Sequence, residues 1–411
     1  MTLLSRREFG GLLAIASSQA ARLSAATGGA AKLDDILRSG VEQRHIPAAC
    51  AMAANANRIL YQGAFGTRDS SGAPVTADSI FAIASMTKAV TTVAALQFVE
   101  QGKVKLDEPV SKFLPQLEKL EVLDGFDADG KPRLRLARTP VTLHHLLTHT
   151  SGFCYDFFDG DMFRYASQHG QAAPDAVPPL MFEPGTRWQY GTGIDWTGRL
   201  VEKLSSMSLE DYFQAKILRP LEMHDTSFIV PQEKFDRLVT GYSRQPDGSL
   251  KQNPRALPKP PKEFNGGGGL YSTTGDYVKF MQMILGKGRG VNQARIVEAK
   301  TVASMEINQI GSLTAGKMKS YRSTLSSDVD IQPGQTEKWS LGFLINAKAY
   351  DGGRSAGSLA WAGIFNTYFW IDPKRSLCAT LMMQYLPFVD KDAVALLGDF
   401  ERELYHGLFR A

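Results

Sequence analysis

The residues of this chain best suited to covalent chemistry are a serine and a lysine three positions apart. Ser85 and Lys88 lie in the stretch Phe81–Val90, which reads FAIASMTKAV. From Lys88 onward, apolar residues recur at helical spacing as far as Gly102, a residue suited to a left-handed helix end. Residues three apart share one helix face, so the lysine amine can reach the serine hydroxyl, and free N–H groups of the first turn can receive an oxyanion. The pattern predicts a nucleophile and its base for acyl transfer.

A simpler interpretation of Ser85 and Lys88 stays open on these residues alone. A helix N-cap serine followed by a surface lysine would give the same pattern. The pair is the only Ser-x-x-Lys match in the chain, and its flanks are small and apolar rather than polar. To accept a proton, Lys88 must be neutral, and we expect desolvation to favour the neutral amine.

A second serine, Ser355, lies in the Gly-x-Ser-x-Gly pattern of residues 353–357. In α/β-hydrolases, that nucleophile elbow follows an apolar strand and precedes a helix. Here the polar loop 348–352 precedes the pattern and a predicted strand follows it. We therefore expect Ser355 to lie in a loop with no catalytic role.

The composition is that of a globular chain with enough apolar residues for a large core. The 411 residues are 43% hydrophobic and carry a net charge of +4, without a basic block, which argues against a nucleic-acid partner. The three cysteines, Cys50, Cys154 and Cys378, fit neither a full disulfide framework nor a metal-binding pattern. The seven histidines include no metal-binding motif, so the sequence implies no metal and no cofactor.

The N-terminus differs from the rest of the chain. Residues 5–9 read SRREF, and a short apolar run and small residues follow as far as Ala26. Residues 1–30 therefore resemble a twin-arginine export signal and leader, which predicts a periplasmic or secreted enzyme. The alternative is a frayed extension on a cytoplasmic enzyme. The apolar run is too short for a stable membrane span.

Several elements are predicted to surround the nucleophile. The spacing of apolar residues predicts a helix over 31–43 and a hairpin of strands 49–54 and 59–65. From 103 to 266 the chain reads as helical and rich in loops, with helices over 144–148 and 195–205, the first capped by Thr142. Thr274 is expected to cap a further helix, and the glycines 266–269 to allow close backbone packing or a flexible joint.

The C-terminal third returns to strands. Strands are expected over 339–345, 357–370 and 376–384, and a final helix over 390–408. Strands at both ends of the chain predict an α+β fold in which one antiparallel sheet from the N- and C-terminal segments is flanked by helices. The predicted division is an α/β domain of residues 31–115 and 265–411, with an inserted helical domain of residues 116–264.

Five segments in sequence order resemble the motifs of one superfamily, the serine β-lactamases and penicillin-binding proteins. Within it, the chain is similar to family VIII carboxylesterases and to lovastatin acyltransferase-like enzymes. The resemblance runs from about residue 31 to the C-terminus and implies a β-lactamase/transpeptidase-like fold. The segments are Ser85-x-x-Lys88, Leu146–Gly152, Pro184–Tyr190, Gly267–Ser272 and Trp361-Ala362-Gly363.

The resemblance implies roles for individual residues. Ser85 would be the acylated nucleophile, and Lys88 and Tyr190 its proton-transfer partners. The backbone N–H groups of Ser85 and Ile364 would form the oxyanion hole. Thr192 stands where the Tyr-x-Asn motif has asparagine, a departure that class C β-lactamases do not share.

Substrate-binding residues are expected on two segments. Trp361-Ala362-Gly363 replaces the Lys-Thr-Gly of β-lactam-processing relatives, as in the esterases. Aromatic residues of 151–179, among them Tyr155 and Phe158, fit either the core or the wall of an apolar acyl pocket.

These features together predict a carboxylesterase that cleaves small-molecule esters with short or medium acyl chains. An acyltransferase using the same intermediate is the alternative, followed by a β-lactamase or D-Ala-D-Ala peptidase, which the missing Lys-Thr-Gly disfavours. A non-catalytic penicillin-binding receptor need not retain Ser85, Lys88 and Tyr190. The sequence does not indicate the oligomeric state.

Overall fold

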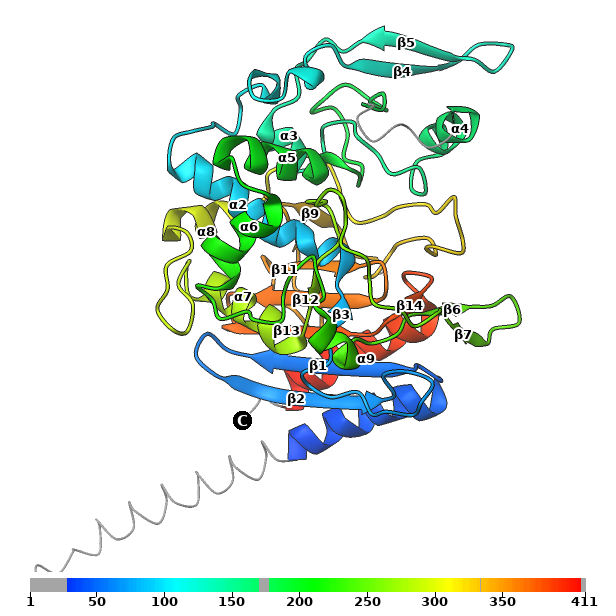
Figure 1. The fold of residues 1–411 in the computed structure, drawn as a ribbon, viewed down its shortest axis with the longest axis vertical. Coiled ribbons are helices and arrows are strands. Elements are labelled where there is room, and N and C mark those ends of the chain that lie inside the picture. The colour runs from blue at the N-terminus through cyan, green and yellow to red at the C-terminus, as the bar shows by residue number, and fades with distance from the viewer. Residues whose placement is uncertain (1–27, 170–176, 333, 408–411) are drawn as a thin grey trace, which may run out of the picture.

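A seven-stranded antiparallel sheet forms the centre of the molecule (Figure 1). The computed structural model describes residues 28–169, 177–332 and 334–407. The strand order is β2-β1-β13-β12-β11-β10-β9, so both ends of the chain contribute to one sheet, which confirms the predicted α+β class. The strands are β1 (Ala48–Ala54), β2 (Ile59–Gly66), β9 (Glu337–Trp339), β10 (Leu344–Asn346), β11 (Leu359–Gly363), β12 (Thr367–Asp372) and β13 (Leu377–Met382).

Strand β1 joins the two ends of the chain. Its seven residues, AACAMAA, are all buried. Ala51 lies opposite Gly63 of β2 on one side and opposite Leu381 of β13 on the other. The small side chains allow helices to pack closely on both faces of the sheet. The predicted hairpin is confirmed, and one of its strands lies inside the sheet.

Helices cover both faces of this sheet. Neighbouring residues of a strand point to opposite faces, and β12 shows this clearly. The Phe369 ring lies 5.1 Å from that of Tyr277 on α7 (Thr274–Leu285), whereas the Trp370 ring lies 6.2 Å from that of Phe400 on α9 (Lys391–Gly407). The helix over residues 28–43 adds Leu33 and Leu37 to the same core.

Helix α2 (Thr87–Glu100) is buried on all sides. Every residue from Thr87 to Phe98 is buried, including the polar side chains of Lys88 and Gln97. A helix buried all round belongs to the core rather than to the surface. It ends as predicted, with Gly102 in the left-handed region at φ +69°. The interpretation of Lys88 as a surface lysine is therefore wrong.

The segment between α2 and α7 contains helices and, unexpectedly, strands. The helices are α3 (Leu143–Leu147), α4 (Gly160–His169), α5 (Gly193–Ser205) and α6 (Leu209–Phe213). Two hairpins that the sequence analysis missed are β4 (Glu121–Phe126) with β5 (Pro132–Leu136), and β6 (Tyr242–Arg244) with β7 (Leu250–Gln252). Strand β14 (Tyr385–Leu386) pairs with β6. The division into two domains stays a prediction.

Helix caps follow the sequence with one correction. Thr142 caps α3 as predicted, accepting a hydrogen bond from the His145 N–H. On α7, however, Thr273 and not Thr274 is the cap, because its side chain accepts from the Asp276 N–H three residues on. Two adjacent threonines made the position ambiguous by one residue.

Two predicted C-terminal strands are interrupted. The expected strand 339–345 divides into β9 and β10 around a turn in which the Ser340 N–H bonds the Phe343 carbonyl. The expected strand 357–370 divides into β11 and β12 around Ile364–Asn366, where Asn366 has a φ of +59°. Asparagine tolerates this left-handed turn conformation better than most residues.

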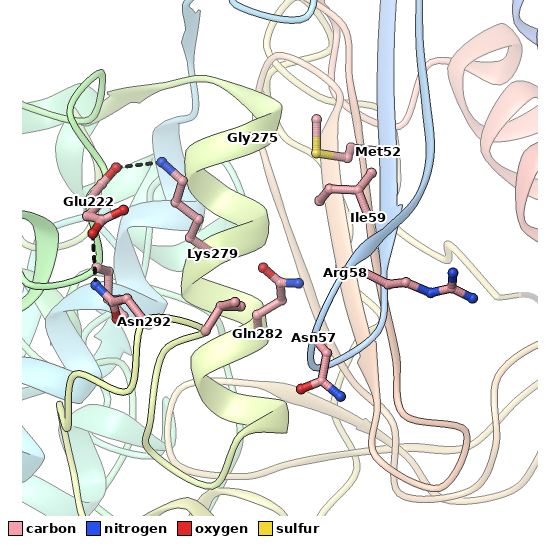
Figure 2. A pocket seen from close by; sticks show the side chains of 11 residues that line it. Met52, Asn57, Arg58, Ile59, Glu222, Gly275, Lys279, Gln282 and Asn292 are labelled. Atoms are coloured by element: carbon pink, nitrogen blue, oxygen red, sulfur yellow. Dashed lines mark hydrogen bonds between the residues drawn. The ribbon is translucent and has the colours of Figure 1, made fainter.

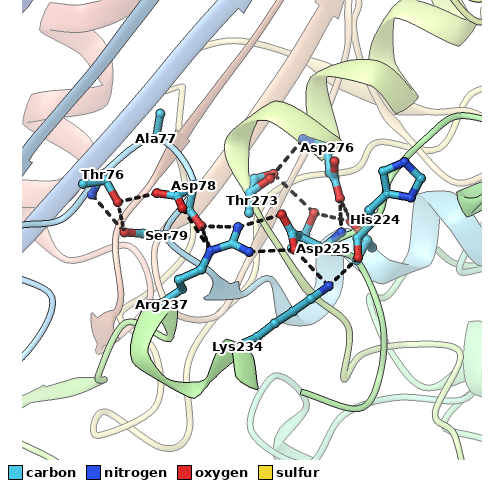
Figure 3. Close-up of polar contacts among 12 residues, drawn as sticks. Thr76, Ala77, Asp78, Ser79, His224, Asp225, Lys234, Arg237, Thr273 and Asp276 are labelled. Atoms are coloured by element: carbon cyan, nitrogen blue, oxygen red, sulfur yellow. Dashed lines mark hydrogen bonds and ion pairs between the residues drawn. The ribbon is translucent and has the colours of Figure 1, made fainter. Parts of the chain in front are cut away.

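A polar network holds the segment that leads to Ser85 (Figure 3). Arg237 pairs with Asp225 at 2.6 Å and with Asp78 at 3.1 Å. The Asp225 N–H donates to Asp276 at the start of α7. Asp78 precedes β3 (Phe81–Ala82), which pairs with β8 (Tyr271–Ser272). The network therefore connects the segment before β3, which is close to Ser85 in the sequence, with the segment that carries Asp225 and Arg237 and with the start of α7.

The expected export signal cannot be compared with the fold. Arg6, Arg7 and the rest of residues 1–27 lie outside the described residues. In the parts of the chain that the structure describes, no helix combines the length and apolar character needed to cross a membrane.

Candidate active site

Ser85 lies in a single 3-10 turn, Ala84–Met86, between β3 and α2. The preceding residue, Ala84, has a φ of +44°, a strained conformation for a residue other than glycine. The end of β11 packs tightly against this turn, because a Cβ on Gly363 would lie 2.3 Å from the Ile83 carbonyl oxygen. Gly363 therefore allows β11 to approach the turn that carries Ser85.

Lys88 directs its amine at three oxygen atoms. Its Nζ lies 3.2 Å from Ser85 Oγ, 3.0 Å from Tyr155 Oη and 2.5 Å from the Gly267 carbonyl oxygen. The side chain is fully buried. The 3-10 turn and the start of α2 thus bring Ser85 and Lys88 together as the spacing predicts.

Tyr190 lies beside the same amine. Lys88 Nζ is 4.9 Å from the centroid of the Tyr190 ring. The indole N–H of Trp361 donates a hydrogen bond of 3.1 Å to Tyr190 Oη, and the two rings are 4.8 Å apart. His149 packs on the ring at 4.7 Å. Tyr190 is thus held by aromatic neighbours from two other segments.

The environment of Lys88 differs from the expected one. Burial by itself lowers the pKa of Lys88, but the negative charge available at Tyr155, Tyr190 and Asp195 outweighs burial and raises this pKa above its usual value. The resting lysine is therefore an ammonium. The expectation of a neutral amine is wrong because the sequence gives no view of these acidic neighbours.

A small cavity opens beside Ser85. Its volume is about 20 Å³, close to the space of one water molecule. Of the predicted residues, Ser85, Tyr190, Phe158, Trp361, Ala362 and Ile364 line it, together with Phe157 and Phe388, which the sequence analysis did not select. The backbone carriers of the expected oxyanion hole, Ser85 and Ile364, thus share one cavity wall.

Two predicted substrate residues have other positions. Tyr155 is not among the residues that line this cavity, and its hydroxyl bonds Lys88 instead. Gly363 does not line it either and acts through close packing. The Lys88 contact of Tyr155 could not be read from the sequence, because 67 residues separate the two side chains.

His149 is buried and uncharged. It accepts a hydrogen bond of 3.4 Å from the Gly191 N–H through Nδ1, while Nε2 has no partner. Burial, together with the Lys88 charge, lowers its pKa well below the usual value. A neutral imidazole packed against Tyr190 supports the ring and adds no charge to the site.

The other candidates for chemistry are structural. Ser355 lies in a loop between β10 and β11, where its N–H donates to Asp372, so it has no elbow geometry, as predicted. Cys50, Cys154 and Cys378 are free and buried. Within residues 28–169, 177–332 and 334–407, no group of His, Cys, Asp or Glu side chains could hold a metal ion.

A larger cavity of about 430 Å³ lies between α7 and the β1–β2 hairpin (Figure 2). Its walls include Met52, Ile59, Lys279 and Gln282, and none of its lining residues also lines the Ser85 cavity. Figure 2 shows Lys279 turned to Glu222, whose carbonyl oxygen it bonds at 2.5 Å. The residues that line this cavity include no serine, threonine or cysteine, so they offer no hydroxyl or thiol nucleophile.

Comparisons with known proteins extend over nearly the whole chain. The family model described as Beta-lactamase matches residues 33–401. The chain is 32% identical over 394 residues to monacolin J acid methylbutanoyltransferase of Aspergillus terreus, covering 91% of this chain and 95% of that protein. It is 30% identical over 404 residues to lovastatin esterase of Penicillium rubens, covering 92% and 98%. A mutant simvastatin synthase from Aspergillus terreus superposes with a TM-score of 0.81 at 31% identity, covering 93% and 98%.

Proposed function

Because this chain belongs to the Beta-lactamase family, we propose that it is a serine-dependent carboxylesterase that forms an acyl-enzyme on Ser85. The observation that carries the proposal is the hydrogen bond of 3.2 Å between the buried Lys88 Nζ in the first turn of α2 and Ser85 Oγ in the 3-10 turn before it. A nucleophile held against a titratable partner in a closed site is what acyl transfer to serine requires.

The proposed reaction has two steps. In the first, the Lys88–Tyr190 pair, after it has lost one proton to solvent, accepts the proton of the Ser85 hydroxyl while Ser85 Oγ bonds the ester carbonyl carbon. The bond to the leaving alkoxide then breaks, and the alkoxide takes that proton. In the second step, water bonds the acyl carbon, the pair carries its proton, and Ser85 leaves as the free hydroxyl.

The oxyanion of each step needs donors that are already in place. Ser85 and Ile364 line the cavity together, the first from a helix start and the second from the β11–β12 turn. Their backbone N–H groups are proposed to receive the oxyanion, a contribution typically worth about 3 to 4 kcal/mol per donor.

The cavity favours small, uncharged acyl groups. Phe157, Phe158 and Phe388 line it, and its volume of about 20 Å³ is small. Short acyl chains are therefore proposed as the better substrates, with longer chains requiring that these rings move apart.

Acyl transfer to an alcohol is the second candidate, favoured by the names of relatives. Similar proteins include a methylbutanoyltransferase and an esterase. Hydrolysis and transfer share the acyl-enzyme and differ only in whether water or an alcohol attacks it. The ratio of hydrolysis to acyl transfer therefore depends on which acceptor, water or an alcohol, reaches the acyl-enzyme.

The deciding experiment uses p-nitrophenyl acetate, butyrate and octanoate with wild type, Ser85→Ala and, as a matched control, Ser355→Ala. Esterase activity is expected to vanish in Ser85→Ala and to persist in Ser355→Ala. Adding an alcohol and analysing products by mass spectrometry measures the transfer fraction. Full activity in Ser85→Ala, or an acyl adduct on Ser355, would refute the proposal.

Export of the folded enzyme is proposed from the leader. Replacing Arg6 and Arg7 by lysine is expected to retain the protein in the cytoplasm at unchanged specific activity. Wild-type protein found in the cytoplasm with its N-terminus intact would contradict the export proposal. It would not contradict the proposed reaction at Ser85.

A further inference from the structure

A carboxylate of α5 reaches Lys88 through a single glycine. The Gly267 N–H donates to Asp195 Oδ1 at 2.6 Å and also to Asn265 Oδ1 at 2.7 Å. The carbonyl of the same glycine accepts from Lys88 Nζ at 2.5 Å. Residue 267 therefore has its N–H fixed by Asp195 and its carbonyl directed at the lysine.

The link requires glycine at this position. A Cβ on Gly267 would lie 2.1 Å from Asp195 Oδ1, closer than two such atoms can approach. Gly266 also packs closely, since a Cβ on it would lie 2.7 Å from the Ile194 carbonyl oxygen. Of the two interpretations of this glycine run, close packing is confirmed for both residues. Asp195 itself is fixed because it lies in the first turn of α5.

We infer that Asp195 is a positioning residue for the reaction: through Gly267 it holds the Lys88 ammonium against Ser85 Oγ, and its negative charge stabilises that ammonium. Asp195 reaches the reacting atoms only through Lys88. The inference rests on the proposed function, because it assigns a role within the Ser85 acylation step.

The charges around Lys88 come from several elements. Tyr155 and His149 face it from the segments after α3, Tyr190 faces it from the segment before α5, and Asp195 from α5 itself. His149 is neutral and the tyrosines are weak acids. Asp195 is therefore the strongest acid in this set.

The surroundings of Asp195 both raise and lower the pKa of its carboxyl group. Burial raises the pKa of the Asp195 carboxyl, while Lys88, the Gly267 N–H and Arg199 lower it. The carboxylate and the ammonium stabilise each other across the glycine, so removing one charge weakens the other.

The test compares Asp195→Asn with Glu202→Gln, which changes the other carboxylate of α5. Glu202 accepts from the Leu209 N–H at 2.9 Å and bonds no active-site group. The readout is the rate at which a p-nitrophenyl phosphonate labels Ser85 between pH 5 and 10, with kcat and KM for p-nitrophenyl butyrate beside it.

We expect Asp195→Asn to move the Lys88-dependent limb of the pH profile down by about one unit. We also expect kcat to fall about tenfold with KM within about twofold, since Asp195 does not line the cavity. Glu202→Gln should match wild type, and Asp195→Glu should recover part of the lost rate.

The outcomes separate this inference from the proposed function. Wild type without label on Ser85 would refute the proposed function. A labelled wild type and a folded Asp195→Asn with superimposable pH profiles would refute this inference alone. If Asp195→Asn and Asp195→Ser both fail to fold while Glu202→Gln folds, Asp195 has a structural role and the inference is overturned.

Discussion

The indole N–H of Trp361 donates a hydrogen bond of 3.1 Å to the hydroxyl oxygen of Tyr190. Trp361→Phe keeps an aromatic ring in the cavity wall but removes this donor. A single hydrogen bond is worth about 0.5 to 1.5 kcal/mol, so we expect kcat on p-nitrophenyl butyrate to fall about three- to tenfold with little change in KM. Trp339→Phe is the control, because its N–H bonds the Leu147 carbonyl instead. Equal losses of kcat in both variants would contradict a specific role for the Trp361 donor.

Two tyrosines surround Lys88, and they are expected to behave differently. Tyr190→Phe should lower kcat by roughly a hundredfold, the scale of a lost acid–base group, because Tyr190 lines the cavity with Ser85. Tyr155→Phe should lower it only several-fold, because its hydroxyl bonds Lys88 outside the cavity. Lys88→Ala combined with Tyr190→Phe should cost little more than either alone. Steady-state kinetics of these variants measure the losses of kcat. Full activity in Tyr190→Phe would show that the Tyr190 phenol has no part in the mechanism.

The aromatic wall is expected to set acyl-chain length. Phe158→Ala removes a buried ring from the cavity and should shift the ratio of octanoate to acetate hydrolysis upward by about tenfold. Phe163→Ala is the matched control, since its ring stacks on Tyr321 at 6.2 Å and does not line the cavity. An unchanged chain-length profile in Phe158→Ala would show that the acyl chain leaves Ser85 along another wall.

Simple esters should be much better substrates than β-lactams. The resemblance implies that Trp361 stands where β-lactam-processing relatives carry the lysine of Lys-Thr-Gly. A charge-assisted contact to the substrate carboxylate contributes about 1.5 to 3 kcal/mol, or about ten- to a hundredfold, and tryptophan cannot supply it. We expect kcat/KM for p-nitrophenyl butyrate to exceed that for nitrocefin by at least this factor. Comparable values for the two substrates would mean that another residue supplies the charge.

The network of Figure 3 predicts a loss of stability in acid. Burial raises the pKa of Asp225, but hydrogen bonds from Arg237 and Lys234 outweigh burial and lower this pKa to about 2. In an unfolded chain the pKa of an aspartate is about 3.9. A lowered folded-state pKa stabilises the fold above pH 4, and this contribution is lost as the pH falls from about 4 to 2. Asp225→Asn should therefore be less stable than wild type at pH 6, with the gap closing by pH 2.

Urea unfolding at several pH values measures this gap. Asp129→Asn, in the exposed β4–β5 turn, is the control and should show no gap at any pH. A gap in Asp225→Asn that stays constant from pH 6 to 2 would show that the hydrogen bonds of Asp225, rather than its charge, stabilise this part of the fold.

Local patterns predicted the parts of the fold that local forces determine. The spacing of Ser85 and Lys88, the helix end at Gly102 and the cap at Thr142 all depend on neighbours within a few residues. The resemblance read from five short segments is confirmed at the level of the superfamily, of its lovastatin acyltransferase-like members and of the fold.

What the sequence could not predict depends on contacts between distant segments. The β11–β12 turn at Asn366 interrupts a continuous apolar run, and only the pairing of the two strands reveals it. The Lys88 contact of Tyr155 and the approach of Asp195 to Gly267 join side chains and backbone from different helices and loops. For the same reason, the protonated state of Lys88 was missed.

The position of β1 between β2 and β13 has a consequence for biosynthesis. While the ribosome makes the chain, the edge of β1 that will meet β13 has no partner until almost the last strand has emerged. An open strand edge can pair with other chains, and the nascent protein exposes this edge through most of its synthesis. Ile364 and Trp361 also arrive late, so a truncated chain would carry Ser85 without its cavity. Under the proposed function, turnover of an ester therefore requires that translation has reached the C-terminal strands.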